Sequence, residues 1–161
     1  MRKRIVETEE HKTIAAILRD KICSDWRKFT IAVDGCTGAG KSELGRYLAW
    51  KLDMPCIETD MYRIEPGVTY PRYRINELKT VIKSRHELNQ PVILEGNFLL
   101  RTMEQISIEP DFLIYVKNKR ADCGYTLRES WLGYLADYKP ERKAHFIFLT
   151  DSFVNVDRDE K

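Results

Sequence analysis

Residues 35–42, GCTGAGKS, have the types and spacing of a loop that binds phosphate groups. They match G-x-x-x-x-G-K-[ST], the P-loop or Walker A pattern. The glycines let the backbone turn tightly, so that successive N–H groups surround a polyphosphate. Lys41 would bring a positive charge to the β- and γ-phosphates, and the Ser42 hydroxyl would ligate Mg²⁺. The expected nucleotide-binding residues are Gly35, Cys36, Thr37, Gly38, Ala39, Gly40, Lys41, Ser42 and Glu43.

Two acidic residues stand where the next apolar runs of the chain end. Asp60 follows the run Pro55–Thr59, and Glu95 ends the run Pro91–Glu95. In open α/β sheets, ligands bind beyond the carboxyl ends of the strands, so both acids are expected near the P-loop. A polyphosphate, Mg²⁺ and two carboxylates together fit the chemistry of phosphoryl transfer.

The two carboxylates are assigned different roles. Phosphoryl transfer needs charge neutralisation and a carboxylate that accepts the proton of the attacking hydroxyl. We assign the base to Asp60, because Tyr62 and Arg63 follow it and would orient a polar acceptor. Glu95 ends a hydrophobic strand expected beside the P-loop strand, the usual place of a Walker-B acid, and is assigned with Ser42 to Mg²⁺. The reverse assignment of the two acids is the alternative.

Strand and helix patterns alternate along the chain. Five short apolar runs, rich in β-branched and aromatic residues, predict strands buried on both faces of a parallel sheet. These runs are Phe29–Asp34, Pro55–Thr59, Pro91–Glu95, Asp111–Val116 and His145–Leu149. The segments with helical period are Thr8–Cys23, Ser42–Leu52, Ile75–Leu88 and Leu127–Tyr138. The alternation predicts an α/β fold with helices on both faces of the sheet.

The composition limits the classes of partner and location. The length of 161 residues, with 43% hydrophobic and 32% charged content, predicts a single domain over residues 1–161. The net charge of +2, from 27 basic and 25 acidic residues, argues against a nucleic-acid binder that works by charge. Neither a membrane span nor an export signal is expected. The four cysteines lack CxxC spacing and favour a reducing, cytoplasmic setting. The oligomeric state is not specified.

Three stretches of the sequence carry a resemblance to a known family. DGCTGAGKSELGRYLAWKL (34–52), ETDMYR (58–63) and PVILEGNFLL (91–100) resemble the uridine kinase-like branch of P-loop kinases, over about residues 28–100. Members of that branch phosphorylate uridine and cytidine, nicotinamide riboside, pantothenate, glycerate or ribulose phosphate. The resemblance implies a three-layer P-loop NTPase fold with a five-stranded parallel sheet in the order 2-3-1-4-5. It also implies ATP and Mg²⁺ as cofactors, Asp60 as base, and a short arginine-bearing lid at about residues 118–138.

Two regions differ from that family pattern. The acceptor segment, Tyr62–Arg74, is shorter than a nucleoside-binding insertion, and it leaves a smaller or anionic acceptor as plausible as uridine. Its candidate substrate-binding residues are Tyr62, Arg63 and Arg74, together with Asp60 and Glu95. Lys119, Arg120 and Arg128 are the candidate lid cations, of which we prefer Arg128. Trp131, Tyr134 and Tyr138 are interpreted as packing residues of the same helix.

The sequence therefore predicts an ATP-dependent kinase that acts on a hydroxyl of a nucleoside-, vitamin- or sugar-like acceptor. A non-catalytic, regulatory nucleotide-binding protein is the main alternative. A GTPase-type switch is a second one, because NKRAD (118–122) follows the fourth apolar run, although its spacing has one residue too many for Asn-Lys-x-Asp. A kinase of nucleic-acid ends or of proteins is a third, and the absence of a basic stripe counts against the nucleic-acid version.

Overall fold

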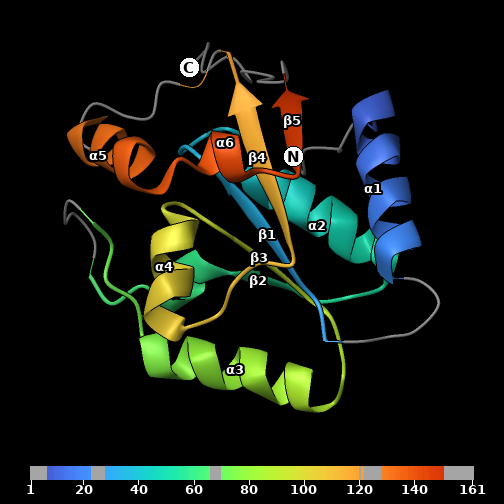
Figure 1. The fold of residues 1–161 in the computed structure, drawn as a ribbon, viewed down its shortest axis with the longest axis horizontal. Coiled ribbons are helices and arrows are strands. Elements are labelled where there is room, and N and C mark those ends of the chain that lie inside the picture. The colour runs from blue at the N-terminus through green and yellow to red at the C-terminus, as the bar shows by residue number, and fades with distance from the viewer. Residues whose placement is uncertain (1–6, 23–27, 66–69, 120, 122–127, 151–161) are drawn as a thin grey trace, which may run out of the picture.

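A five-stranded parallel sheet organises the chain (Figure 1). The computed structural model describes residues 7–22, 28–65, 70–119, 121 and 128–150. The strands lie in the order β2-β3-β1-β4-β5, as the resemblance implied, and every neighbouring pair is parallel. Their bounds are β1 Thr30–Gly35, β2 Cys56–Glu58, β3 Val92–Gly96, β4 Phe112–Asn118 and β5 Phe146–Thr150. All five predicted strands are present, so the predicted fold class is confirmed.

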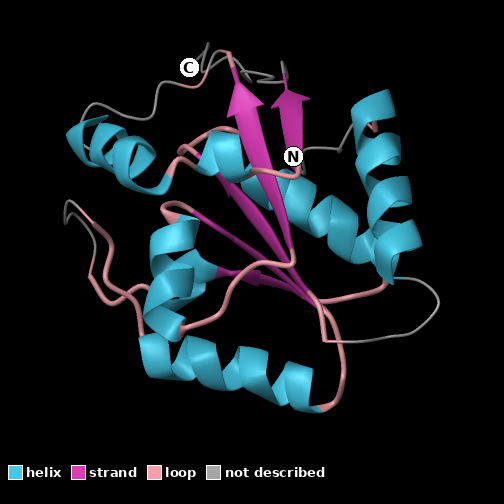
Figure 2. Cartoon of the chain, in the orientation of Figure 1, coloured by secondary structure: helices cyan, strands magenta, loops and turns pink. Residues whose placement is uncertain are grey.

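Six α-helices accompany the strands among the described residues (Figure 2). They are α1 Glu9–Ile22, α2 Lys41–Leu52, α3 Ile75–Glu87, α4 Leu99–Ile106, α5 Arg128–Tyr138 and α6 Pro140–Lys143. Four of them match the predicted helices, although Cys23 and Leu127, at the ends of two predictions, lie outside the described residues. The sequence interpretation missed α4 and α6. Both are short, and α4 follows β3 after only two residues, so neither shows a helical period long enough to predict a helix.

The two faces of the sheet each bury their own apolar cluster. In β1, Ile31 and Val33 pack on one side with α1 and α2, whereas Ala32 packs on the other side with α3, α4 and α5. This alternation follows from the two-residue period of a strand. Burial on both faces explains why the strand sequences are continuously apolar. The helices on either side of the sheet can be followed in Figure 1.

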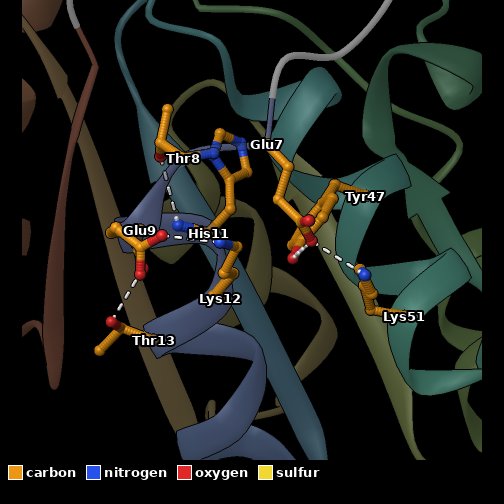
Figure 3. Close-up of polar contacts among 8 residues, drawn as sticks. All are labelled: Glu7, Thr8, Glu9, His11, Lys12, Thr13, Tyr47 and Lys51. Atoms are coloured by element: carbon orange, nitrogen blue, oxygen red, sulfur yellow. Dashed lines mark hydrogen bonds and ion pairs between the residues drawn. The ribbon is translucent and has the colours of Figure 1, made fainter.

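Helix α1 is fixed at its start by a group of polar contacts (Figure 3). Thr8 precedes the helix, and its backbone N–H donates to His11 Nδ1 at 3.2 Å, an arrangement that resembles a capping box. Glu7 accepts a hydrogen bond from the Tyr47 hydroxyl at 2.7 Å and pairs with Lys51 at 2.9 Å. These contacts hold the start of α1 against α2.

No helix in the described part of the chain is both long and apolar enough to cross a bilayer.

Candidate active site

The P-loop connects β1 to α2 through backbone that requires glycine. A Cβ on Gly35 would lie 2.5 Å from the carbonyl oxygen of Val116, so strand β4 leaves no room for a side chain there. Gly40 has a φ of 102°, a conformation that L side chains rarely adopt, and caps α2 without a side-chain hydrogen bond. The first N–H groups of α2 therefore have no side-chain cap, which is the arrangement that binds phosphate.

Lys41 lies folded over this loop. Its side chain is buried, and its Nζ donates to the carbonyl oxygen of Cys36 at 2.8 Å. Burial lowers the pKa of Lys41, while the carboxylates of Glu95 and Asp34, and more weakly that of Asp60, oppose the shift. The ammonium group therefore lies among carboxylates from the ends of β1 and β3 and from the turn after β2. A bound polyanion would add to the stabilisation of its charged form.

Ser42 and Glu95 meet beside the lysine. The Ser42 hydroxyl donates to Glu95 Oε1 at 3.1 Å. Burial raises the pKa of Glu95, and Lys41 and the Ser42 hydrogen bond oppose that rise. Helix α2 comes close enough for this contact because Gly45 has no side chain: a Cβ there would lie 2.8 Å from the sulfur of Cys56.

This pair fits a magnesium ion that also binds nucleotide phosphates. Hydroxyl and carboxylate oxygens are hard ligands of the kind that Mg²⁺ takes. Within the described residues no group of three or more His, Cys, Asp or Glu side chains forms a metal cluster. Mg²⁺ needs no such cluster in a phosphate site, because it keeps several waters and takes phosphate oxygens as ligands.

Asp60 lies in a 3₁₀ turn, Thr59–Tyr62, directly after β2. It is exposed, and its carboxylate acts electrostatically on both Lys41 and Glu95. It also faces the acceptor segment: burial raises the pKa of Tyr73 to about 12, and the Asp60 charge contributes to the rise. The structure therefore brings Asp60 and Glu95 to one edge of the sheet together with Lys41.

The acceptor segment folds back on itself. Arg63 and Tyr73 form an isolated antiparallel bridge, and residues 66–69 between them lie outside the described residues. Arg63 donates to the carbonyl oxygen of Glu65, and Arg72 forms an ion pair with the Glu65 carboxylate.

Arg74 pairs with Glu77, donates to the carbonyl oxygen of Met61 and lies over the ring of Tyr62. The candidate acceptor-binding cations are thus engaged with nearby groups.

The lid region is described in part. Lys119 and Arg128 are exposed, and Arg128 is the first residue of α5. Arg120 and residues 122–127 lie outside the described residues. Trp131 and Tyr134 are buried, and Tyr138 is half-buried, which confirms that these aromatic residues pack.

Three polar residues near the P-loop were not among the predicted site residues. Asn97 donates to the Thr37 hydroxyl at 3.1 Å, which links the residue after β3 to the loop. Asp34 is fully buried and accepts a hydrogen bond from the backbone N–H of Gly35 at 2.8 Å. Tyr134 donates to Asp34 from α5. The first two adjoin the predicted motifs directly, whereas Tyr134 is distant in sequence and no local pattern indicates its contact.

Comparison with known proteins gives a likeness in structure alone. No model of a known protein family matches the sequence, and no curated protein matches it. A structure described as a possible uridine kinase from Bacillus stearothermophilus has a TM-score of 0.64 at 15% identity, covering 87% of this chain and 97% of the other.

Two further kinases have a similar structure. A sugar kinase from a Janibacter species has a TM-score of 0.53 at 15% identity, covering 76% of this chain and 85% of its own. A gluconokinase from Sinorhizobium meliloti has a TM-score of 0.51 at 17% identity, covering 78% and 84%. The chain therefore has the fold of small-molecule P-loop kinases, as the sequence resemblance predicted.

Proposed function

We propose that the protein is a phosphotransferase that uses Mg²⁺ and ATP to phosphorylate a hydroxyl of a small molecule. The observation that carries this proposal is the contact of Ser42 with Glu95, 3.1 Å long, next to the buried ammonium of Lys41. It joins the start of the P-loop helix to the end of the neighbouring strand, where a metal would bridge protein and phosphate. A glycine-rich turn without ligand would need neither group.

Each residue then has a role in transfer. The backbone of Gly35 to Glu43 holds the phosphates, and Lys41 neutralises the charge that develops on the transferred group. Ser42 and Glu95 hold the metal, directly or through its waters. When bound, ATP would supply the phosphoryl group and Mg²⁺ would offset its negative charge. Asp60 accepts the proton of the attacking hydroxyl, which requires contact with the acceptor directly or through one water.

The other predicted residues act on the acceptor and on the lid. Tyr62, Arg63 and Arg74 bind the acceptor beside Asp60, and Arg128 stabilises the transferring phosphoryl group from the start of α5. The proteins of similar fold are described as a possible uridine kinase, a sugar kinase and a gluconokinase, which supports a small, polar, hydroxylated acceptor. A nucleoside-, vitamin- or sugar-like compound meets that description.

A regulatory nucleotide-binding protein is the second candidate. It is favoured by the contacts of Arg63, Arg72 and Arg74, whose side chains are all bonded to groups in or beside their own segment. An acceptor would have to replace some of these contacts. The P-loop and Asp60 would then serve only to sense ATP.

A phosphoryl-acceptor screen separates the two candidates. The wild-type protein is incubated with Mg²⁺ and γ-labelled ATP and with nucleosides, vitamins and sugar acids in turn, and Lys41→Ala serves as the blank. Label in a product from the wild type alone supports the kinase. ATP binding by calorimetry without labelled product from any acceptor would favour the regulatory protein.

A further inference from the structure

One buried carboxylate lies under the P-loop without a role in the chemistry above. Asp34 is the residue before Gly35 and has no exposed surface. Its Oδ1 accepts hydrogen bonds from the backbone N–H groups of Gly35, at 2.8 Å, and of Leu99, at 3.5 Å. Its Oδ2 accepts from the hydroxyl of Tyr134. One side chain therefore links β1 with the starts of the P-loop and α4, and with the middle of α5.

Tyr134 makes the corresponding contacts from α5. Only 1% of its surface is exposed, and burial beside Asp34 raises the pKa of its hydroxyl, which stays a donor. The same oxygen accepts the backbone N–H of Leu100 at 3.0 Å. The ring packs against Phe98 and Trp131, with ring centroids 5.4 and 5.2 Å away. The hydroxyl is thus bonded to both β1 and α4, while the ring fills the core.

Apolar packing alone does not require this bond. Two apolar side chains of similar volume would fill the same space and avoid burying a charge. A hydrogen bond to a buried carboxylate fixes direction as well as distance, and it is strengthened by the low local dielectric. The pair therefore determines where α5 lies relative to the P-loop more strictly than the ring contacts do.

The position of α5 matters for the candidate lid. Arg128 begins this helix six positions before Tyr134, about 9 Å along the axis. The carbonyl oxygen of Ser130 accepts the Tyr70 hydroxyl at 3.0 Å, so the first turn of α5 also touches the acceptor segment. A shift of α5 would move both Arg128 and this contact with Tyr70.

We propose that Tyr134 is a positioning residue whose bond to Asp34 holds α5, and with it Arg128, in register with the P-loop. This inference rests on the proposed phosphoryl transfer, in which Arg128 stabilises the transferring group. Because only 1% of its surface is exposed, Tyr134 itself is not expected to touch nucleotide or acceptor. It acts through the helix that it anchors.

The test compares two identical substitutions in one helix. Tyr134→Phe keeps the ring and removes the hydroxyl. Tyr138→Phe is the matched control, because Tyr138 also donates to a carboxylate, that of Glu104, but does so at the surface. Its ring, which stacks on that of Tyr134 with centroids 5.1 Å apart, is kept in this variant. Turnover is measured with an acceptor found in the screen, and ATP affinity is measured by calorimetry.

We expect Tyr134→Phe to lower kcat about 10- to 100-fold, because small displacements of positioned groups cost this much, with the Kd for ATP within about twofold of wild type. Tyr138→Phe should stay within about twofold of wild type in both. Replacing Arg128 by Ala should lower kcat by a much smaller factor in the Tyr134→Phe background than in the wild type. Equal costs in both backgrounds, or an unchanged kcat in Tyr134→Phe, would overturn the proposal.

Amide hydrogen exchange tests the anchor even if no acceptor is found. The amides of residues 131–138 should exchange about tenfold faster in Tyr134→Phe than in wild type, and at the wild-type rate in Tyr138→Phe. If the wild-type protein transfers no phosphoryl group to any acceptor, the proposed function is refuted, but the exchange rates still test whether the bond of Tyr134 to Asp34 anchors α5. Wild-type protection of α5 in Tyr134→Phe would refute the anchor whatever the activity.

Discussion

The P-loop and the acceptor segment both follow the carboxyl ends of strands, β1 and β2, but are built differently. At the P-loop, Lys41 and Glu95 are buried, and the contact of Ser42 with Glu95 joins two elements of the fold. In the acceptor segment, Arg63 and Arg72 are exposed and bonded to neighbouring groups of the same segment. The P-loop with Lys41, Ser42 and Glu95, here called the phosphate half of the site, is therefore preorganised. The acceptor segment, here called the acceptor half, must exchange internal contacts for contacts with a ligand.

The largest effect is expected in the phosphate half. Lys41→Ala removes the buried ammonium that would neutralise the transferred group, and turnover should fall on the order of 10³-fold. Steady-state kinetics with ATP and an acceptor from the screen measure it. Lys79→Ala on α3 is the control for loss of a lysine. A Lys41→Ala protein that turns over at the wild-type rate would show that the P-loop has no part in the chemistry.

Asp60 marks the boundary between the two halves. Asp60→Asn removes the base but preserves the shape of the side chain, so kcat should fall about 100-fold while the Kd for ATP stays unchanged. Asp53→Asn, at the exposed C-cap of α2, is the control. Calorimetry and kinetics together separate binding from transfer. Normal transfer by Asp60→Asn would assign the base elsewhere, with Glu95 as the next candidate.

Gly96, the last residue of β3, lies close against the side chain of Thr59, the residue before Asp60. A Cβ on Gly96 would lie 1.9 Å from the hydroxyl oxygen of Thr59, a fully buried residue next to Asp60. Gly96→Ala should therefore lower the free energy of unfolding by about 3 kcal/mol, as overpacking does. Gly133→Ala, in α5, should stay within about 1 kcal/mol of wild type, because helix propensity offsets a milder contact. Urea denaturation of both variants tests this prediction. Equal free energies of unfolding for the two variants would mean that the turn shifts without cost to accept the Cβ at position 96.

The smallest effect is expected in the acceptor segment. Arg72→Ala breaks an exposed ion pair with Glu65, so the free energy of unfolding should change by less than about 1 kcal/mol. ATP binding should not change, because the phosphate half does not depend on this pair. The acceptor KM is the sensitive readout. A loss of ATP affinity in Arg72→Ala would show that the two halves are coupled and that the contrast between them is wrong.

The same contrast explains what the sequence could predict. The P-loop was predicted because its chemistry lies in eight consecutive residues, and the two acids because they follow apolar strands. The strands were predictable because burial on both faces makes them continuously apolar. The contacts of Arg63 and Arg72 were not predictable, because the partner of a long charged side chain depends on how its segment folds.

Contacts between distant parts of the chain were also beyond prediction. The bond of Tyr134 to Asp34 joins residues 100 positions apart, and nothing in the local sequence indicates it. Helix α4 was missed because a stretch of eight residues is too short for its helical period to be distinguished from an apolar strand end. Phe98, which precedes it, has a φ of 53°, a conformation that a bulky side chain rarely adopts, so its residue type does not indicate where α4 begins.

The most direct test is the Mg²⁺ dependence of ATP binding in the wild type and in Glu95→Gln. If Ser42 and Glu95 hold the metal, the wild type should bind ATP at least about tenfold more tightly with Mg²⁺ than with EDTA. Glu95→Gln should lose that gain and keep the affinity measured in EDTA, since the P-loop backbone and Lys41 are intact. A Glu95→Gln protein with the full Mg²⁺ gain would contradict the metal site, and with it the convergence of P-loop and carboxylates on phosphoryl transfer.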